Sequence, residues 1–259
     1  MALRSFRPIL VVFLLAGTLR AADNPFAGTW KLNPAKSKLT DQMKVEAVGP
    51  DKYTFIFSGD NSETIVADGT DQPGLFGSTF AVTILSPHQW KVVRKTGGHV
   101  TISAIWDLSS DGNTLTDNFT GYRADGSTSN LLYRYSRTAG TSGFAGTWES
   151  TEEQVNSVYE MQVQTYEDNG LSFINPAQKI TKSMKFDGKD YAAQGPNLPA
   201  GYATSGRSLG DHAVELTDKI DGKVLDTQQV EVSPDSKILT ITTHIPGHSK
   251  PNIQVFDRQ

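Results

Sequence analysis

The feature that most constrains the fold of this chain is an internal repeat. The run Phe26–Trp30 (FAGTW) returns unchanged as Phe144–Trp148, 118 positions later. Further matches follow in the same order at offsets of 118 to 124, and the last one aligns Tyr135–Arg137 with Phe256–Arg258. Insertions in the loops between aligned strands produce such small drifts. An ordered series of matches at one period indicates two copies of a single structural unit.

The repeat predicts the domain boundaries. We expect a first domain over residues 25–137 and a second over residues 143–259. The segment 138–143 between them (TAGTSG) is small and polar, which is typical of a short flexible linker.

Both halves show the alternation of apolar and polar residues that is typical of antiparallel strands. In Val100–Trp106 every second side chain is apolar, so one face of the strand is apolar and the other polar. Asp-Gly and Asn-Gly pairs separate such runs and supply the positive φ of tight hairpins. About nine short strands in each repeat, with no long amphipathic helix, predict an all-β fold of two tandem antiparallel β-barrels.

The first 21 residues predict a secretory signal peptide. Arg4 and Arg7 precede the apolar run Ile9–Gly17, and small residues follow, so we expect cleavage near Ala21. The apolar run is shorter than the roughly 20 residues of a membrane-spanning helix. The mature chain is therefore expected to be secreted or periplasmic, without membrane insertion after cleavage.

Charge and composition exclude several classes of function. Cleavage removes three arginines and leaves 21 basic against 28 acidic residues, a net charge of −7. A nucleic-acid partner is not expected, because binding phosphates requires a basic face. The absence of cysteine excludes disulfides, thiol catalysis and thiolate metal sites.

The ends of each repeat resemble the calycin superfamily of lipocalins and fatty-acid-binding proteins. The Gly-x-Trp of a first strand and an arginine in the last strand carry the resemblance, and Phe26–Leu32 is especially similar to the opening strand of fatty-acid-binding proteins. The repeats also resemble paired lipocalin-like domains of exported bacterial proteins. The resemblance implies lipocalin-like barrels, each closed at one end by an arginine over a tryptophan: Trp30 with Arg137, and Trp148 with Arg258.

A lipocalin-like frame implies that a small apolar ligand enters through the open end of a barrel. Two loops rich in Gly and Pro, residues 72–80 and 194–205, carry apolar side chains suited to such an entrance. The candidate portal residues are Leu75, Phe76, Leu198 and Tyr202.

The sequence contains no catalytic motif and predicts no cofactor. No Gly-x-Ser-x-Gly elbow, phosphate-binding loop or dinucleotide fingerprint is present. His244 and His248 are the best candidates for metal ligands, although a surface turn explains both more simply. Three hypotheses follow: a binding protein for a small apolar molecule, an envelope or extracellular structural or protein-interaction module, and, ranked last, an enzyme that acts on a lipid or isoprenoid.

Overall fold

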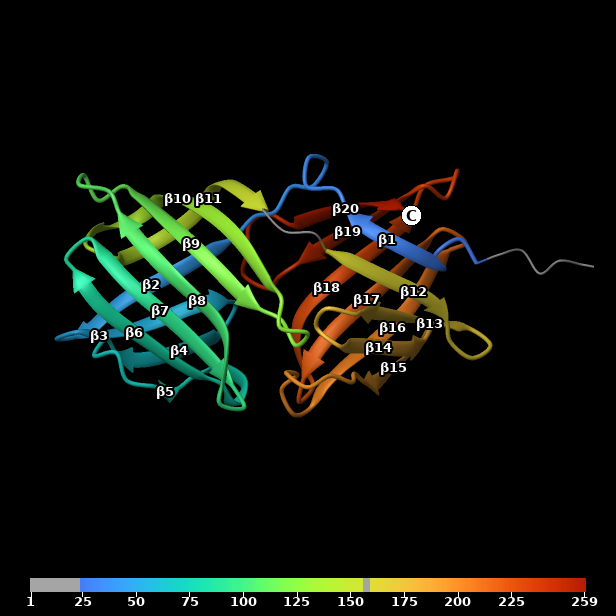
Figure 1. The fold of residues 1–259 in the computed structure, drawn as a ribbon, viewed down its shortest axis with the longest axis horizontal. Helices are drawn as coiled ribbons and strands as arrows, with labels where there is room; N and C mark the ends of the chain where they lie inside the picture. The colour runs from blue at the N-terminus through green and yellow to red at the C-terminus, as the bar shows by residue number, and fades with distance from the viewer. Residues whose placement is uncertain (1–23, 156–158) are drawn as a thin grey trace, which may run out of the picture.

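The computed structural model describes residues 24–155 and 159–259. They form two ten-stranded antiparallel sheets, each curled into a nearly closed barrel (Figure 1). The predicted all-β fold with two tandem barrels is thus confirmed. The predicted signal peptide lies outside the described residues. No helix among the described residues is long and apolar enough to cross a membrane.

Barrel 1 has the strand order β4-β3-β2-β11-β10-β9-β8-β7-β6-β5. The 3-10 turn η1 (Leu75–Gly77) follows β5 and is the single helical element in the described part of the chain. The strands are β2 (Gln42–Gly49), β3 (Lys52–Ser58), β4 (Asn61–Val66), β5 (Gln72–Pro73), β6 (Thr79–Ser86), β7 (Gln89–Thr96), β8 (His99–Leu108), β9 (Thr114–Tyr122), β10 (Thr128–Ser142) and β11 (Ala145–Val155).

Barrel 2 has the equivalent order β14-β13-β12-β1-β20-β19-β18-β17-β16-β15. Each barrel has one strand more than the nine expected per repeat. The strands are β1 (Gly28–Leu32), β12 (Glu160–Thr165), β13 (Gly170–Asn175), β14 (Ile180–Lys185), β15 (Asp187–Ala192), β16 (Tyr202–Gly210), β17 (Ala213–Ile220), β18 (Lys223–Val232), β19 (Ile238–His244) and β20 (Asn252–Arg258).

The two repeats exchange their first strands. β1 belongs to the first repeat but pairs with β12 and β20 in barrel 2, whereas β11 belongs to the second repeat but pairs with β2 and β10 in barrel 1. In Figure 1 the blue β1 lies among the yellow and red strands of barrel 2. The barrels therefore do not coincide with the expected domains 25–137 and 143–259. Barrel 1 consists of residues 42–155, and barrel 2 consists of residues 160–258 together with β1.

The exchange also corrects the role of the expected linker 138–143. These residues end β10 and turn into β11, so they form a hairpin inside barrel 1 rather than a connection between domains. The chain passes between the barrels after β1, through residues 33–41, and again between β11 and β12. The first passage is hydrogen-bonded to barrel 2, because the Lys38 and Ile253 backbones pair at 2.7 and 2.8 Å.

A tryptophan and an arginine seal one end of each barrel, but the expected pairs are wrong. Arg137 lies over Trp148, and Arg258 lies over Trp30, with 4.2 and 4.1 Å from the guanidinium carbon to the ring centroid. Each arginine therefore covers the tryptophan of the other repeat. Because the strands have been exchanged, each tryptophan is the cross-strand partner of the arginine in its own barrel.

Equivalent hydrogen bonds from the arginine to backbone carbonyls stabilise both seals. Arg137 donates to the backbone carbonyls of Gly112, Ala145 and Gly143 at 2.5 to 2.7 Å. In the seal of barrel 2, Arg258 donates in the same way to the backbone carbonyls of Ser236, Ala27 and Pro25. The planar guanidinium, with five donors, can hold three loops while stacking on an indole.

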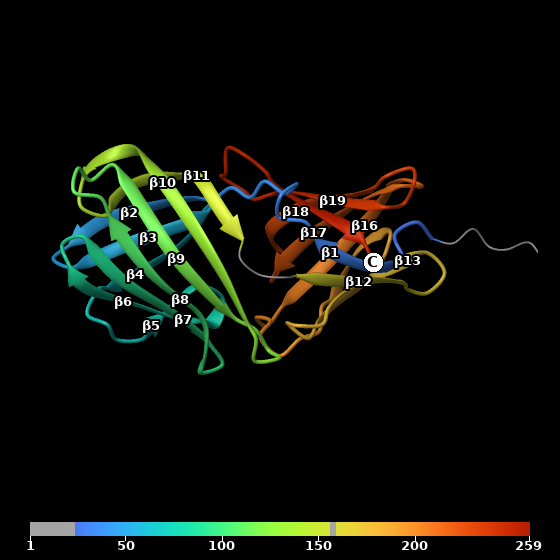
Figure 2. The same ribbon diagram turned by 45° about the horizontal axis from the view of Figure 1, so that its top comes forward.

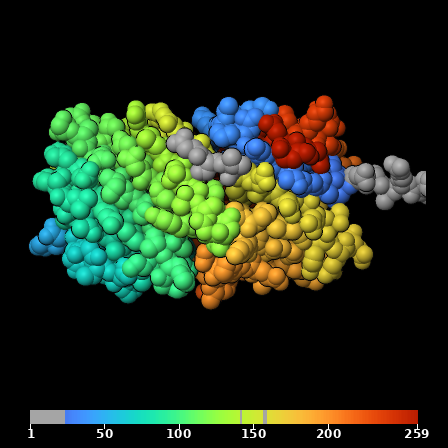
Figure 3. Space-filling view, in the orientation of Figure 1, coloured from blue at the N-terminus to red at the C-terminus, as the bar shows by residue number. Residues whose placement is uncertain are grey.

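The unsealed ends of the barrels face each other (Figure 2). Asp125 N, in the β9–β10 turn, donates to Ala177 O, in the β13–β14 turn, at 3.0 Å. A hydrogen bond of 2.7 Å joins His248 Nε2 to Phe57 O. In the space-filling view the yellow-green hairpin of barrel 1 lies against the orange part of barrel 2 (Figure 3). The unsealed end of each barrel is therefore partly covered by the other barrel.

Candidate functional site

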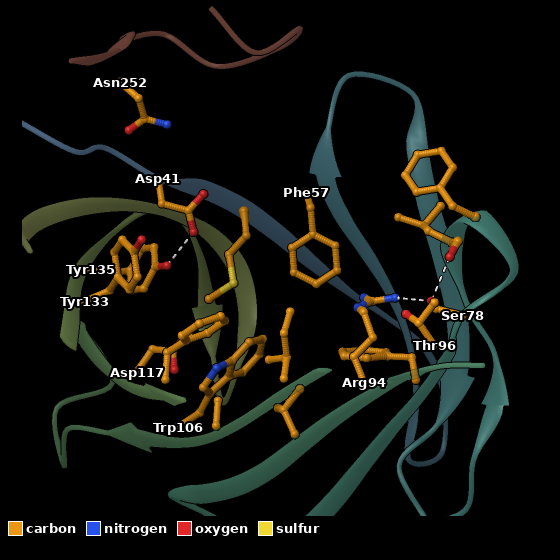
Figure 4. Close-up of a pocket in the computed structure, with 18 of the residues that line it drawn as sticks. Asp41, Phe57, Ser78, Arg94, Thr96, Trp106, Asp117, Tyr133, Tyr135 and Asn252 are labelled. Atoms are coloured by element: carbon orange, nitrogen blue, oxygen red, sulfur yellow. Dashed lines mark hydrogen bonds between the residues drawn. The ribbon is translucent and has the colours of Figure 1, made fainter. Parts of the chain in front are cut away.

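A cavity of about 480 Å³ opens inside barrel 1 at its unsealed end. Its volume lies within the range of small-molecule sites, which runs from about 300 to 1,000 Å³. Most of its wall is aromatic or aliphatic and comes from strands on all sides of the barrel (Figure 4). The apolar wall includes Phe57, Phe80, Val92, Ile102, Trp106 and Phe119.

At two positions of the cavity wall, barrel 1 has a small side chain where barrel 2 has a larger polar one. Ser78 and Ala104 line the cavity, and the equivalent positions in barrel 2, 124 residues later, hold Tyr202 and Gln228. In barrel 2 these larger side chains reach an inward-facing Asp218: Gln228 Nε2 donates to its carboxylate at 3.0 Å, and the Tyr202 hydroxyl lies beside it. The equivalent space in barrel 2 is thus occupied by polar side chains.

One side of the cavity gathers two carboxyl groups and two phenols, which we call the acidic pole: Asp41, Asp117, Tyr133 and Tyr135 (Figure 4). Asp41 directly precedes β2, Asp117 faces inward from β9, and the tyrosines face inward from β10. The Tyr135 hydroxyl donates to Asp41 Oδ2 at 2.5 Å. Burial raises the pKa of both tyrosines, so they remain protonated donors at neutral pH.

Asp117 is the most exceptional group of the acidic pole. Its side chain is 7 % exposed, and its Oδ1 atom is buried without a hydrogen-bond partner. Desolvation raises its pKa to about 7; the Trp106 indole opposes that rise, and the Asp41 carboxylate adds to it. Trp106 is the cross-strand partner of Asp117, but its N–H forms no hydrogen bond of acceptable geometry, so Trp106 Nε1 is also buried and unpartnered.

The pKa of Asp41 is also raised, again mainly because of burial. The Tyr135 hydrogen bond and the nearby His248 ring oppose that shift. Glu153, on β11 beside this pole, accepts a hydrogen bond of 2.8 Å from Ser150, while its Oε2 atom has no partner. Burial, together with the Asp41 charge, raises the pKa of Glu153 to about 7. Three carboxyl groups therefore share one poorly hydrated region.

The opposite side of the cavity holds a closed ion pair. Arg94 donates to both carboxylate oxygens of Glu63 and, through Nη1, to Ser78 Oγ at 2.8 Å. Its guanidinium carbon lies 4.5 Å from the Phe80 ring centroid. Glu63 also accepts the Leu75 backbone N–H at 2.8 Å, which ties η1 to the barrel wall. The Arg94 charge is thus already neutralised by a protein group.

Barrel 2 carries the same ion pair with its charges reversed. The residues equivalent to Glu63 and Arg94 are Lys182 and Asp218, which form a buried salt bridge. The acid is almost fully buried in each pair, with 2 % exposure for Glu63 and 1 % for Asp218. Buried charges persist only when they are paired and hydrogen-bonded. The interior of each barrel therefore needs one cation and one anion at these positions, in either order.

The predicted portal residues fall into two groups. Leu75 and Phe76 line the cavity, and Phe76 adopts a positive φ of 56° within η1. Leu198 and Tyr202 do not line it. Tyr202 instead faces Lys182 inside barrel 2, 5.6 Å from ring centroid to Nζ. The loop that carries Leu198 does reach the cavity, because Pro199 lines it from barrel 2, as does Asn252.

The two candidate metal ligands, His244 and His248, lie in different surroundings. His244 is exposed at the end of β19, whereas His248 docks on barrel 1. Within the described residues, no group of three or more His, Cys, Asp or Glu side chains could hold a metal ion.

Sequence analysis missed the acidic pole, although one signal of it is visible. In β9 the inward positions are Leu115, Asp117 and Phe119, so a carboxyl group interrupts the apolar face of the strand. Asp41 has no such signal, because it lies outside the alternating pattern and reaches the cavity only through the passage between barrels.

Comparisons of the chain with protein-family models, with curated proteins and with solved structures find no match.

Proposed function

We propose that this protein binds a small, predominantly apolar molecule in the cavity of barrel 1. The observation that carries the proposal is the 480 Å³ cavity itself, with its mainly apolar wall in a chain whose second barrel has polar side chains in the equivalent space. Empty apolar cavities cost stability, since their walls lose van der Waals contacts, and a ligand restores those contacts. A cavity of this size therefore favours binding over a purely structural role.

The resemblance to calycins supports the same proposal. Each barrel combines a Gly-x-Trp strand with a sealing arginine at one end and an unsealed opposite end, as a lipocalin-like binding protein would. The amino-terminal residues 1–21 have the pattern of a signal peptide. We therefore propose an exported, lipocalin-like binding protein that holds its ligand in barrel 1.

The experiment is a titration with the neutral fluorophore N-phenyl-1-naphthylamine, whose emission rises in apolar sites. Ala104→Phe would fill the cavity from β8. Ser103→Phe adds the same ring to the neighbouring position, whose side chain faces the opposite side of the sheet. We expect wild type and Ser103→Phe to bind the fluorophore and Ala104→Phe to bind at least tenfold more weakly.

Equal binding by all three proteins would place the fluorophore elsewhere and overturn the proposal. Native mass spectrometry of the purified chain then identifies any retained molecule. If no small molecule binds at all, a structural or protein-interaction role becomes the better explanation.

A further inference from the structure

We propose that the ligand of barrel 1 is an organic cation, an amine whose protonated nitrogen lies at the acidic pole and whose apolar body fills the rest of the cavity. This inference rests on the proposed binding function and specifies the chemical class of the ligand.

The first argument is that a buried carboxylate oxygen of the acidic pole lacks a hydrogen-bond donor. Asp117 is one of the residues that line the cavity, and its Oδ1 atom is buried without a hydrogen-bond partner, although the Trp106 indole lies beside the carboxyl group. An unpartnered buried acceptor costs free energy, which a donor from a ligand recovers. An ammonium group supplies up to three donors and a positive charge, so it matches a carboxylate better than a hydroxyl does.

The second argument is the charge of the lining. Asp41 and Asp117 both line the cavity, and Arg94 is the one basic side chain among the described residues that line it. Arg94 is held by Glu63 and Ser78 on the other side. The described lining thus offers the acidic pole no basic residue of its own, since His248, whose charge lowers the pKa of Asp41, lies outside that lining. A cationic ligand would neutralise it, whereas a carboxylate ligand would add a further negative charge.

The third argument is the aromatic surface around the carboxyl groups. The rings of Trp106, Tyr133 and Tyr135 line the same side of the cavity (Figure 4). Aromatic faces attract cations, and more strongly where water is excluded. Rings beside paired carboxyl groups therefore favour an alkyl- or arylammonium over a neutral molecule of the same shape.

The position of the acidic pole at the passage between the barrels indicates how the ligand is oriented in the cavity. Asp41 lies in the passage between the barrels, and the cavity wall there includes Asn252 of barrel 2. Phe57 lies between this pole and Arg94 (Figure 4), and Phe80 and Val92 belong to the same apolar wall. An amphipathic amine would place its nitrogen beside Asp117 and its hydrocarbon part along this wall.

The test compares three probes that share one hydrocarbon chain: octylamine, octanol and octanoate. Binding is measured by isothermal titration calorimetry at pH 7.5, with wild type, Asp117→Asn and Asp226→Asn. Asp226 is the matched control, because it is a half-buried acid of barrel 2 whose pKa desolvation raises to about 6, and it does not line the cavity. Circular dichroism verifies that each variant is folded.

We expect octylammonium to bind wild type at least tenfold more tightly than octanol, and octanoate to bind most weakly. Asp117→Asn should remove the preference for the amine while it leaves octanol binding within about threefold, and Asp226→Asn should behave as wild type. If octanol binds wild type as tightly as octylammonium, or if Asp117→Asn keeps the preference, the amine assignment is overturned while the binding function stands. If none of the three probes binds wild type while N-phenyl-1-naphthylamine does, the amine assignment alone is overturned; if the fluorophore does not bind either, both proposals fail.

Discussion

Arg258 lies over the ring of Trp30, 4.1 Å from guanidinium carbon to ring centroid, although 228 positions of sequence separate the two residues. They meet because β1 inserts between β12 and β20. The Trp30 N–H donates to Phe26 O at 2.8 Å, so the chain ahead of β1 is fastened to the same seal. The first strand of repeat one, β1, thus completes barrel 2. The first strand of repeat two, β11, completes barrel 1 in the same way.

The strand exchange can be tested by cross-linking, because the chain has no cysteine of its own. Lys31 and Glu160 are exposed cross-strand partners in β1 and β12. Directly opposed residues have Cβ atoms about 4.5–5.5 Å apart, within reach of a disulfide after small adjustments. We expect Lys31→Cys with Glu160→Cys to form an intramolecular disulfide on oxidation, detected by mass spectrometry.

The matched control for this experiment is Lys31→Cys with Gln42→Cys. Without exchange, Lys31 would lie opposite Gln42, just as Glu149 does in barrel 1. A disulfide in the control pair and none in the first pair would show that each repeat keeps its own strand.

The arginine seal should contribute strongly to the stability of barrel 2. Arg258→Met removes the stacking on Trp30 and leaves three carbonyl groups without their donor. We expect the free energy of unfolding to fall by about 2–4 kcal/mol, measured by urea denaturation. Arg207→Met is the control, since that arginine pairs with Glu215 at the surface and should change stability by less than about 1 kcal/mol. Equal effects would contradict a special role for the seal.

A glycine in the same seal leaves no room for a side chain beside the arginine. A Cβ at Gly28 would collide with Nη1 of Arg258, and one at Gly146 would collide with Nη1 of Arg137. We expect Gly28→Ala to displace the arginine and lower the thermal midpoint by several degrees. Gly126→Ala provides the comparison for backbone effects, because that glycine also has a positive φ but no atom near its missing Cβ. A larger loss for Gly126→Ala would show that backbone strain, not the arginine, dominates.

The reversed ion pairs predict that charge order is interchangeable but charge balance is not. Glu63→Gln leaves Arg94 without its carboxylate and should cost about 3–5 kcal/mol of unfolding free energy. The double variant Glu63→Lys with Arg94→Asp copies the Lys182–Asp218 pair of barrel 2 and should recover most of that loss. Denaturant titration of the three proteins measures this, and a double variant less stable than Glu63→Gln would contradict the prediction.

The free energy of unfolding should decrease as the pH rises toward the raised pKa of Asp117 in the acidic pole. Asp117 has a pKa of about 7 in the folded chain against an ordinary value of 3.8, so the folded state binds more protons between these pH values. The free energy of unfolding therefore falls as the pH rises from about 4 to 7 and then levels off. Asp41, Glu153, Tyr133, Tyr135 and Trp106 surround the group, and Asp41 and Glu153 shift in the same direction.

Asp117→Asn should remove the Asp117 share of this decrease, on the order of a few kcal/mol. The variant should match wild type near pH 4 and exceed it increasingly up to pH 7.5, as measured by urea denaturation at each pH. A constant difference between the two proteins across this range would contradict a raised pKa at Asp117.

The same ionisation predicts how amine binding depends on pH. Octylammonium needs an ionised Asp117, so its affinity for wild type should rise as the pH increases from 5.5 to 7 and level off above that. Octanol, which carries no charge, serves as the control and should bind equally across the range. A pH-independent affinity for octylammonium would separate amine binding from Asp117.

The repeat, the alternation of apolar and polar residues and the Asp-Gly turns were enough to predict two antiparallel barrels, because strand faces and hairpins depend on neighbouring residues. The resemblance of the two FAGTW runs to calycin opening strands implied that Trp30 and Trp148 seal the barrels. Their partners could not be predicted, since Trp30 and Trp148 lie in identical local sequences, and only the path of residues 33–41 decides which barrel each one enters.

The cavity likewise depends on the tertiary structure. Its volume depends on the sizes of all inward side chains on many strands. The contribution of a small residue such as Ala104 therefore cannot be predicted until its neighbours across the barrel are known. The carboxyl of Asp117 interrupts an apolar strand face in the sequence, but its meeting with Asp41 depends on the exchanged strand and the facing barrels. Local patterns determined the strands of this protein, and contacts between distant residues decided how they are shared and what they enclose.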